Sequence, residues 1–243
     1  YKGFHRLARM WPEITARGPD ARLVVIGSGK LYNRENEVGT WGVASETYEQ
    51  DFRPYLADSD GLPDSSVEFK GNLGTEKIPL LRNADVGIPN PPKSSTETFC
   101  LTGVEFQAAG TPVVSAAQGG LLDTVRDGET GILVRSDDEL VDAIVELLQN
   151  RKKRERLGRA AMEFTRRKFA YREICEDWRT LFERVGEGLP VRPVPIKSNL
   201  FHQDKWLREA MRLLKKAVPR FRGVPPLFAT GKRDLARHFL RRL

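Results

Sequence analysis

The chain has 243 residues, 40% of them hydrophobic, which is enough for one large domain with a substantial core. No run of about eighteen apolar residues occurs, which excludes a membrane-spanning helix of ordinary length, and two cysteines are too few for a disulfide framework. The net charge of +7 is uneven, because the residues after Glu187 contain 14 Lys and Arg against 3 Asp and Glu. We therefore expect a cytoplasmic protein with an acidic main domain and a basic C-terminal tail.

Hydrophobic periodicity predicts helices and strands that alternate along the chain. In chain order we expect a helix at 3–15, a strand at 23–26, a helix at 43–56, a strand at 67–70, a helix at 76–83, a strand at 85–88, a helix after Glu97, a strand at 112–116, a short helix after Gly120, a strand at 131–134, and helices at 137–149, 151–168 and 171–185. The continuous apolar run at 23–26 is typical of a strand buried on both faces of a parallel sheet. The alternation indicates βαβ units and a doubly wound parallel sheet of the α/β class.

Glycines and prolines follow the predicted strands, on the edge where doubly wound sheets bind ligands. They are Gly27, Gly29, Gly71, the Pro-rich loop 89–92 and the pair Gly119 and Gly120. A Gly-x-Gly sequence lets the backbone approach a ligand closely, although a plain tight turn has the same pattern.

The stretch 97–114, ETFCLTGVEFQAAGTPVV, combines two carboxylates with a predicted helix start. Glu97 precedes the helix and Glu105 lies within it. The N-terminus of a helix has unpaired N–H groups and a partial positive charge, which suit a phosphate, while a carboxylate can accept hydrogen bonds from sugar hydroxyls. A surface glutamate and a helix-facing glutamate in an ordinary α/β unit explain the spacing equally well.

Six segments in this order resemble a known family: KG, LVVIGSG, VEFKGNL, LLRNADVGI, ETFCLTGVEFQAAGTPVV and GGLLDTVRDGETGILV. Together they are similar to the C-terminal, donor-binding domain of a retaining GT-B glycosyltransferase of family 4, also called group 1, over roughly residues 1–185. The resemblance implies a Rossmann-like doubly wound sheet, the C-terminal half of a GT-B fold. It also implies transfer of a sugar from a nucleotide-diphosphate sugar, of the UDP or GDP type, to a glycan, lipid or other acceptor.

The resemblance also implies roles for individual residues. Lys2 and Glu97 match the catalytic positions, with Lys2 on the donor diphosphate and Glu97 near the donor sugar. The remaining donor-binding positions are Gly27 and Gly29 under the diphosphate, Gly71 to Leu73 at the nucleobase, Glu105 at the ribose, and the helix start formed by Thr98, Phe99, Cys100, Leu101 and Thr102. In retaining transfer, negative charge grows on the leaving diphosphate, where Lys2 and the helix N–H groups are aimed. No Asp-x-Asp sequence occurs among these motifs, so we expect no metal and no other cofactor.

Two departures from the family pattern concern the site. Thr98 and Cys100 stand where the family often has glycine, and we interpret Cys100 as a packing residue rather than a nucleophile. The family's diphosphate-binding arginine and its N-terminal acceptor-binding domain lie outside this chain. We therefore expect the chain alone to bind donor weakly and to be inactive.

The sequence predicts a division into a nucleotide-sugar-binding domain at 1–187 and a Pro-rich linker with a basic amphipathic helical tail at 188–243. Residues 199–243 could dock on an anionic membrane surface, which would make the protein peripheral on the inner membrane face, or pack on the N-terminal domain or another partner. Nucleic acid is disfavoured because no aromatic stacking platform accompanies the charge. Two other functions stay open, a GT-B-type nucleotide-sugar epimerase and a non-catalytic nucleotide-binding module.

Overall fold

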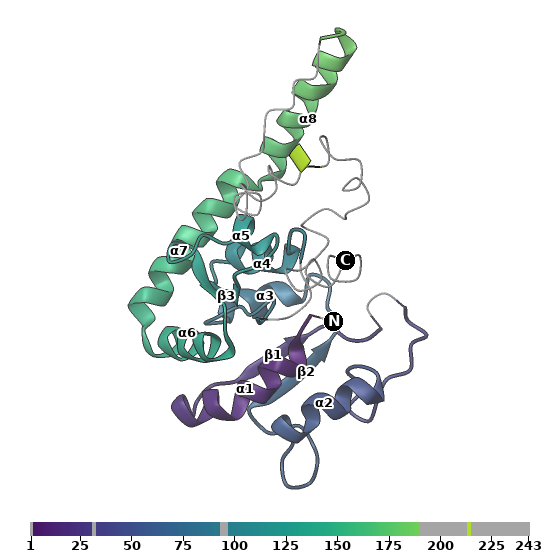
Figure 1. Ribbon diagram of the computed structural model, residues 1–243, viewed down its shortest axis with the longest axis vertical. Helices are drawn as coiled ribbons and strands as arrows, with labels where there is room; N and C mark the ends of the chain where they lie inside the picture. The colour runs from purple at the N-terminus through teal and green to yellow at the C-terminus, as the bar shows by residue number, and fades with distance from the viewer. Residues whose placement is uncertain (1, 31–32, 93–96, 190–212, 215–243) are drawn as a thin grey trace. The chain divides into compact units, whose positions relative to one another are not determined.

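The computed structural model describes residues 2–30, 33–92, 97–189 and 213–214 (Figure 1). The chain divides into two compact units, Tyr1–Pro195 and Ile196–Leu243, and only Leu213 and Leu214 of the second are described, both of them helical. The predicted boundary at 187 and the predicted basic tail thus stay predictions, because the tail lies otherwise outside the described residues. None of the helices in the described part is both long and apolar enough to span a membrane.

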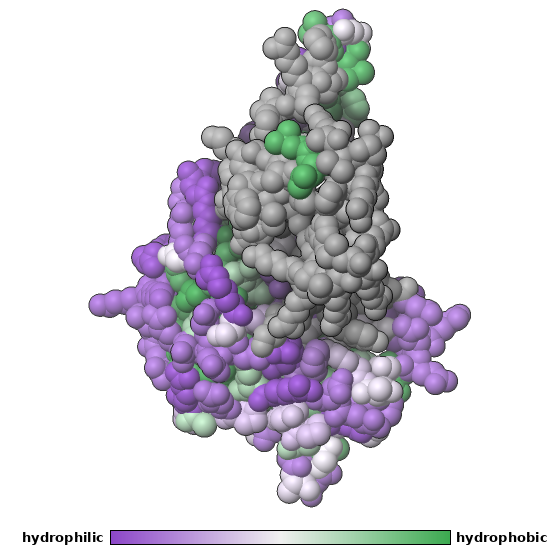
Figure 2. Space-filling view, viewed as in Figure 1, coloured by the Kyte–Doolittle hydropathy of each residue, from purple (hydrophilic) through white to green (hydrophobic). Residues whose placement is uncertain are grey.

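Helices and strands alternate in the first unit, close to the order expected from the sequence. The elements are α1 (Phe4–Arg17), β1 (Leu23–Ile26), α2 (Glu46–Leu56), β2 (Val67–Gly71), α3 (Lys77–Asn83), α4 (Leu101–Ala108), β3 (Val113–Ala116), α5 (Leu121–Thr124), β4 (Gly131–Val134), α6 (Asp137–Gln149), α7 (Arg151–Lys168) and α8 (Tyr171–Gly186). α8 exposes the apolar residues Tyr171, Ile174, Trp178, Phe182 and Val185. The rest of the described surface in Figure 2 is mostly hydrophilic.

The strands form two parallel pairs, β1 with β2 and β3 with β4. Gly87 adds a single parallel bridge to Val113 on the other edge of β3, with its N–H donating to the Pro112 carbonyl at 2.9 Å. The predicted strand at 85–88 is therefore wrong in extent, since only this bridge remains of it. Pro89 and Pro91 follow at once, and a proline has no N–H to continue a ladder.

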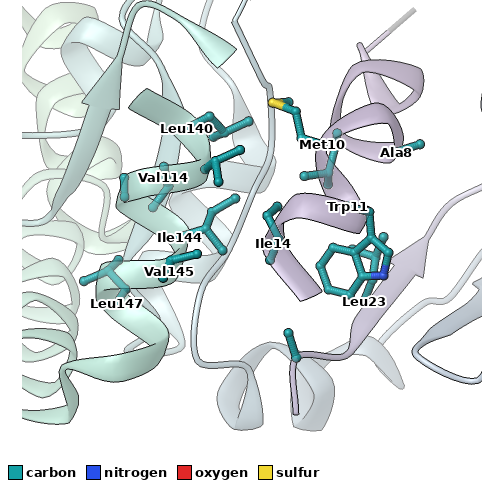
Figure 3. Packing of buried hydrophobic residues seen from close by; sticks show 14 of the residues in the cluster. Ala8, Met10, Trp11, Ile14, Leu23, Val114, Leu140, Ile144, Val145 and Leu147 are labelled. Carbon is teal, nitrogen blue, oxygen red and sulfur yellow. The ribbon is translucent and has the colours of Figure 1, made fainter. Parts of the chain in front are cut away.

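Burial differs between the two pairs. All four residues of β3 are buried, whereas Val24 of β1 is 43% exposed. The prediction that residues 23–26 are buried on both faces is thus wrong. Leu23 is buried and lies beside Trp11 (Figure 3), whereas Val25 and Ile26 are only partly buried, so the layers around β1 cover its two faces incompletely.

One hydrophobic core joins both strand pairs, because α1 packs on β1 and β2 and also faces α6. Figure 3 shows Met10 and Ile14 of α1 opposite Leu140 and Ile144 of α6. α1 presents these residues at helical spacing, which explains why a helix was predicted there. This packing places the start of α1 at the carboxyl edge of β1, since the short connection 18–22 makes helix and strand antiparallel.

A buried carboxylate organises the loop before α2. Glu49 is fully buried and accepts hydrogen bonds from the N–H groups of Trp41, Val43 and Ala44 at 2.7, 2.8 and 3.0 Å. The helix predicted at 43–56 begins only at Glu46, because the loop N–H groups are used in these bonds. The Val43 carbonyl in turn accepts from the N–H of Gly29 at 2.7 Å, so Glu49 helps to place the glycine turn after β1.

Close packing of α7 gives the first test of the fold. A Cβ added at Gly158, inside α7, would lie 2.1 Å from the backbone carbonyl oxygen of Gly110. We expect Gly158→Ala to lower the free energy of unfolding by about 2 kcal/mol, despite the higher helix propensity of alanine, because backbone atoms cannot yield there. Chemical denaturation measures the change. Gly186→Ala is the matched control, since an added Cβ there meets nothing within 4 Å, and equal losses in the two variants would contradict the steric explanation.

Candidate functional site

The structure brings together the two residues predicted to be catalytic. Gly3 takes a left-handed conformation (φ 84°) at the N-cap of α1, and the Nζ of the preceding Lys2 contacts Oε1 of Glu97. The side chain of Lys2 is 60% exposed, whereas that of Glu97 is only 15% exposed. The lysine is therefore free to turn toward a ligand, while the carboxylate is held in place.

The segment that carries Glu97 is fixed from behind by a glycine turn. The N–H of Gly120 donates to the Glu97 carbonyl at 2.6 Å, and a Cβ on Gly120 would lie 2.2 Å from the carbonyl oxygen of Thr98. Only glycine permits this approach. The turn at 119–120, predicted to line the ligand edge, thus acts by supporting the segment at 97–98.

Cys100 forms the N-cap of α4 with φ 63° and ψ 72°. Within the described ranges it is the single non-glycine residue with a positive φ, a conformation that usually requires glycine. Its thiol is buried and donates to Oδ1 of Asn90 at 3.7 Å. Burial raises the pKa of the Cys100 thiol, which fits the predicted packing role.

The predicted helix start at 98–102 is divided by this cap. Thr98 and Phe99 precede the helix, Leu101 and Thr102 form its first turn, and all four are exposed. The first N–H groups of a helix have no acceptor in a preceding turn, so this end of α4 is open to an anion. Phe99 also packs edge-on against Phe169 at 5.4 Å between ring centroids, a contact that nothing in the sequence spacing indicates.

Glu105 lies in the second turn of α4 and pairs with a lysine that sequence analysis missed. Nζ of Lys77, at the start of α3, lies 2.6 Å from Oε1 of Glu105. Both side chains are about 30% exposed, at 29% and 30%. Figure 1 shows α3 and α4 close to β3, which places this pair on the same part of the molecule as the start of α4.

The glycines after β1 and β2 also meet. The N–H of Gly27 (φ 122°) donates to the carbonyl of Gly71 (φ 65°) at 2.7 Å, at the carboxyl ends of the two parallel strands. Leu73 lies two residues beyond and is partly buried. Gly29 continues this edge, held by its bond to Val43.

Lys2 connects the two groups of predicted site residues. Phe4, two residues after Lys2, packs edge-on against Phe69, the middle residue of β2, with 5.9 Å between the ring centroids. The start of the chain thus contacts β2 through Phe4 and the Glu97 segment through the Lys2 side chain. No group of three or more His, Cys, Asp or Glu side chains suited to a metal occurs in the described part of the chain, and the expectation of a metal-free site stays a prediction.

Solved structures identify the class of fold. The chain is similar to sucrose-phosphate synthase from Thermosynechococcus elongatus, with a TM-score of 0.59 and 25% identity over 77% of this chain and 43% of that one. It is also similar to HepE from Anabaena in complex with UDP-glucose, with a TM-score of 0.53 and 21% identity over 74% of this chain and 46% of that one. The fold is the Rossmann-like half of a GT-B glycosyltransferase, which confirms the predicted fold class.

The chain belongs to the family described as glycosyl transferases group 1, whose model matches residues 1–164. This finding confirms the family predicted from the motifs. The D-inositol 3-phosphate glycosyltransferase of Stackebrandtia nassauensis is 33% identical over 192 residues, which cover 78% of this chain and 38% of that protein. The match covers 38% of that protein and 36% of the enzyme of the same name from Corynebacterium aurimucosum, so the chain spans less than two fifths of the length of these two curated relatives.

The two cysteines give a test of the geometry at the start of α4. Burial raises the pKa of the Cys100 thiol, so a smaller fraction of it is thiolate at a given pH than for an ordinary cysteine. Cys175, by contrast, is exposed to reagents in solution. At pH 8 we expect iodoacetamide to alkylate Cys100 at least about tenfold more slowly than Cys175, measured by peptide mass spectrometry. In urea the two rates should converge. Equal rates in the folded protein would contradict the buried position of the thiol.

Proposed function

We propose that this chain is the donor-binding part of a retaining, hexosyltransferase-type glycosyltransferase that moves a sugar from a nucleotide-diphosphate sugar to a glycan, lipid or other acceptor. The observation that carries the proposal is the contact between Lys2 and Glu97 beside the open N-terminus of α4. A cation, a helix N-terminus and a carboxylate together suit a diphosphate joined to a sugar. The family supports transfer of a sugar, and the UDP-glucose complex of HepE supports a donor of the UDP type.

The proposed chemistry follows from where charge develops. When the bond between the anomeric carbon and the diphosphate breaks ahead of attack by the acceptor, negative charge collects on the leaving phosphate. Lys2 is exposed enough to turn from Glu97 to that phosphate. The N–H groups of Leu101 and Thr102, the first two residues of α4, lie at the helix N-terminus and can donate to the same phosphate. The helix N–H groups are in place beforehand, and Lys2 turns when the donor binds, so both face the phosphate before the bond breaks and stabilise the charge as it forms.

The carboxylates have separate tasks in this proposal. Glu97, once released by Lys2, accepts hydrogen bonds from hydroxyls of the donor sugar. Glu105 holds the ribose, and the turn at 71–73 meets the base through its backbone. The acceptor site belongs to the N-terminal domain of the whole protein. Docking of residues 199–243 on an anionic membrane at the inner face stays part of the proposal.

Titration with nucleotides tests the proposal. We expect the full-length protein to bind one of UDP, GDP or ADP and its sugar conjugate saturably in calorimetry. Lys2→Met should lower diphosphate affinity by about tenfold or more, since it removes a charge-assisted hydrogen bond. Glu105→Ala should lower nucleotide affinity by a similar factor and leave the fold intact, because its side chain is 30% exposed.

Glu146→Ala is the matched control for Glu105→Ala, since Glu146 also pairs with a lysine at 2.6 Å but lies on α6. Unchanged affinity in Lys2→Met would count against the diphosphate role. Nucleotide binding by the full-length wild type without any turnover of the nucleotide sugar would favour a non-catalytic nucleotide-binding module, and absence of any nucleotide binding would contradict the proposal. Release of an epimerised nucleotide sugar, with no transfer to an acceptor, would favour an epimerase.

A further inference from the structure

Both ends of α3 are hydrogen-bonded to the segment formed by α4 and the loop that follows it to β3. At its C-terminal end, Oγ1 of Thr111 donates to the carbonyls of Leu81 and Ala84 at 2.5 and 3.4 Å. At its N-terminal end, Nζ of Lys77 donates to Oε1 of Glu105 at 2.6 Å. The Thr111 hydroxyl bonds to backbone carbonyls, and its bond to Leu81 is buried, whereas the Lys77 bond is a partly exposed contact between two side chains. Lys77 therefore supplies the side-chain contact with α4 at the N-terminal end of α3.

That end of α3 continues directly from the turn proposed to meet the nucleobase. Lys77 lies four residues after Leu73, and its partner Glu105 is the residue proposed to hold the ribose. Base and ribose are joined covalently, so the groups that hold them must keep a fixed separation. The Lys77–Glu105 pair links the residue proposed to hold the ribose to the helix that follows the turn proposed to meet the base.

The pair also selects which carboxylate oxygen faces a ligand. Lys77 occupies Oε1 of Glu105, and a carboxylate presents its two oxygens in different directions. With Oε1 held, Oε2 remains for hydroxyl groups. A long glutamate side chain that is fixed before binding loses less conformational entropy when the ribose arrives.

We propose that Lys77 is a positioning residue for the nucleoside half of the donor, acting through Glu105 and the turn at 71–73. The inference rests on the proposed function. It assigns Lys77 no contact with the phosphates, which distinguishes it from Lys2. Its contribution to affinity is therefore confined to ligands that carry a nucleoside, and it requires the Glu105 carboxylate.

The experiment compares two ligands in calorimetric titrations of the full-length protein: inorganic pyrophosphate, and whichever of UDP, GDP or ADP the wild type binds. We expect Lys77→Met to lower nucleotide affinity about fivefold, the scale of one such ion pair, and to leave pyrophosphate affinity unchanged. Lys77→Arg should retain most of the affinity. In the Glu105→Gln background, Lys77→Met should cause no further loss.

Lys153→Met is the matched control, because Lys153 pairs with Glu146 at the same 2.6 Å with a side chain that is 28% exposed. It should change neither affinity, and its melting temperature should match that of Lys77→Met. Any one of three results would overturn this inference while leaving the proposed function intact. They are an equal loss of pyrophosphate affinity in Lys77→Met, an unchanged nucleotide affinity in Lys77→Met, and a full further loss of nucleotide affinity when Lys77→Met is added to Glu105→Gln. Failure of the wild type to bind any nucleotide would instead remove the proposed function, and the inference with it.

Discussion

The candidate site depends on one approach of backbone to backbone, that of Gly120 to the segment at 97–98. The N–H of Gly120 bonds to the Glu97 carbonyl at 2.6 Å, and a Cβ on Gly120 would overlap the carbonyl of Thr98. This contact fixes the chain immediately before Cys100 and therefore decides where α4 can begin. The turn itself has no reactive group, but it determines the position of the helix start and of the Glu97 carboxylate. Because Lys2 contacts that carboxylate, the turn also determines where Lys2 lies in the absence of a ligand.

Charge compensation is the second constraint on the site. Two carboxylates near the open end of a helix would repel the diphosphate that this end attracts. In the structure each is paired with a lysine from another element, Lys2 with Glu97 and Lys77 with Glu105. The two lysines differ in exposure, 60% for Lys2 and 29% for Lys77. We interpret the more exposed one as the lysine that moves to the phosphates and the less exposed one as the lysine that stays.

The sequence was sufficient wherever a feature is local. The hydrophobic spacing in α1, the glycines after β1 and β2 and the order of helices and strands all depend on near neighbours, and they were predicted. Burial of Val24 and the extent of the strand at 85–88 were predicted wrongly, because they depend on which distant elements cover or pair with them. Lys77 was missed for the same reason, since its partner lies 28 residues further along the chain. The spacing of residues within one segment does not predict which side chain of a distant segment will contact it.

Cys100 shows how far packing can override a residue's own preference. A left-handed backbone costs a non-glycine residue on the order of 1–2 kcal/mol, so the conformation at φ 63° is unfavourable by itself. The side chain offsets part of this cost, because its sulfur is buried and reaches the amide oxygen of Asn90. The backbone of Cys100 is constrained from both sides, by the contact of Gly120 with the segment before it and by α4, which begins directly after it. The site therefore has the left-handed geometry typical of glycine although a cysteine occupies the position, because its surroundings, more than the residue itself, determine the fold of the segment.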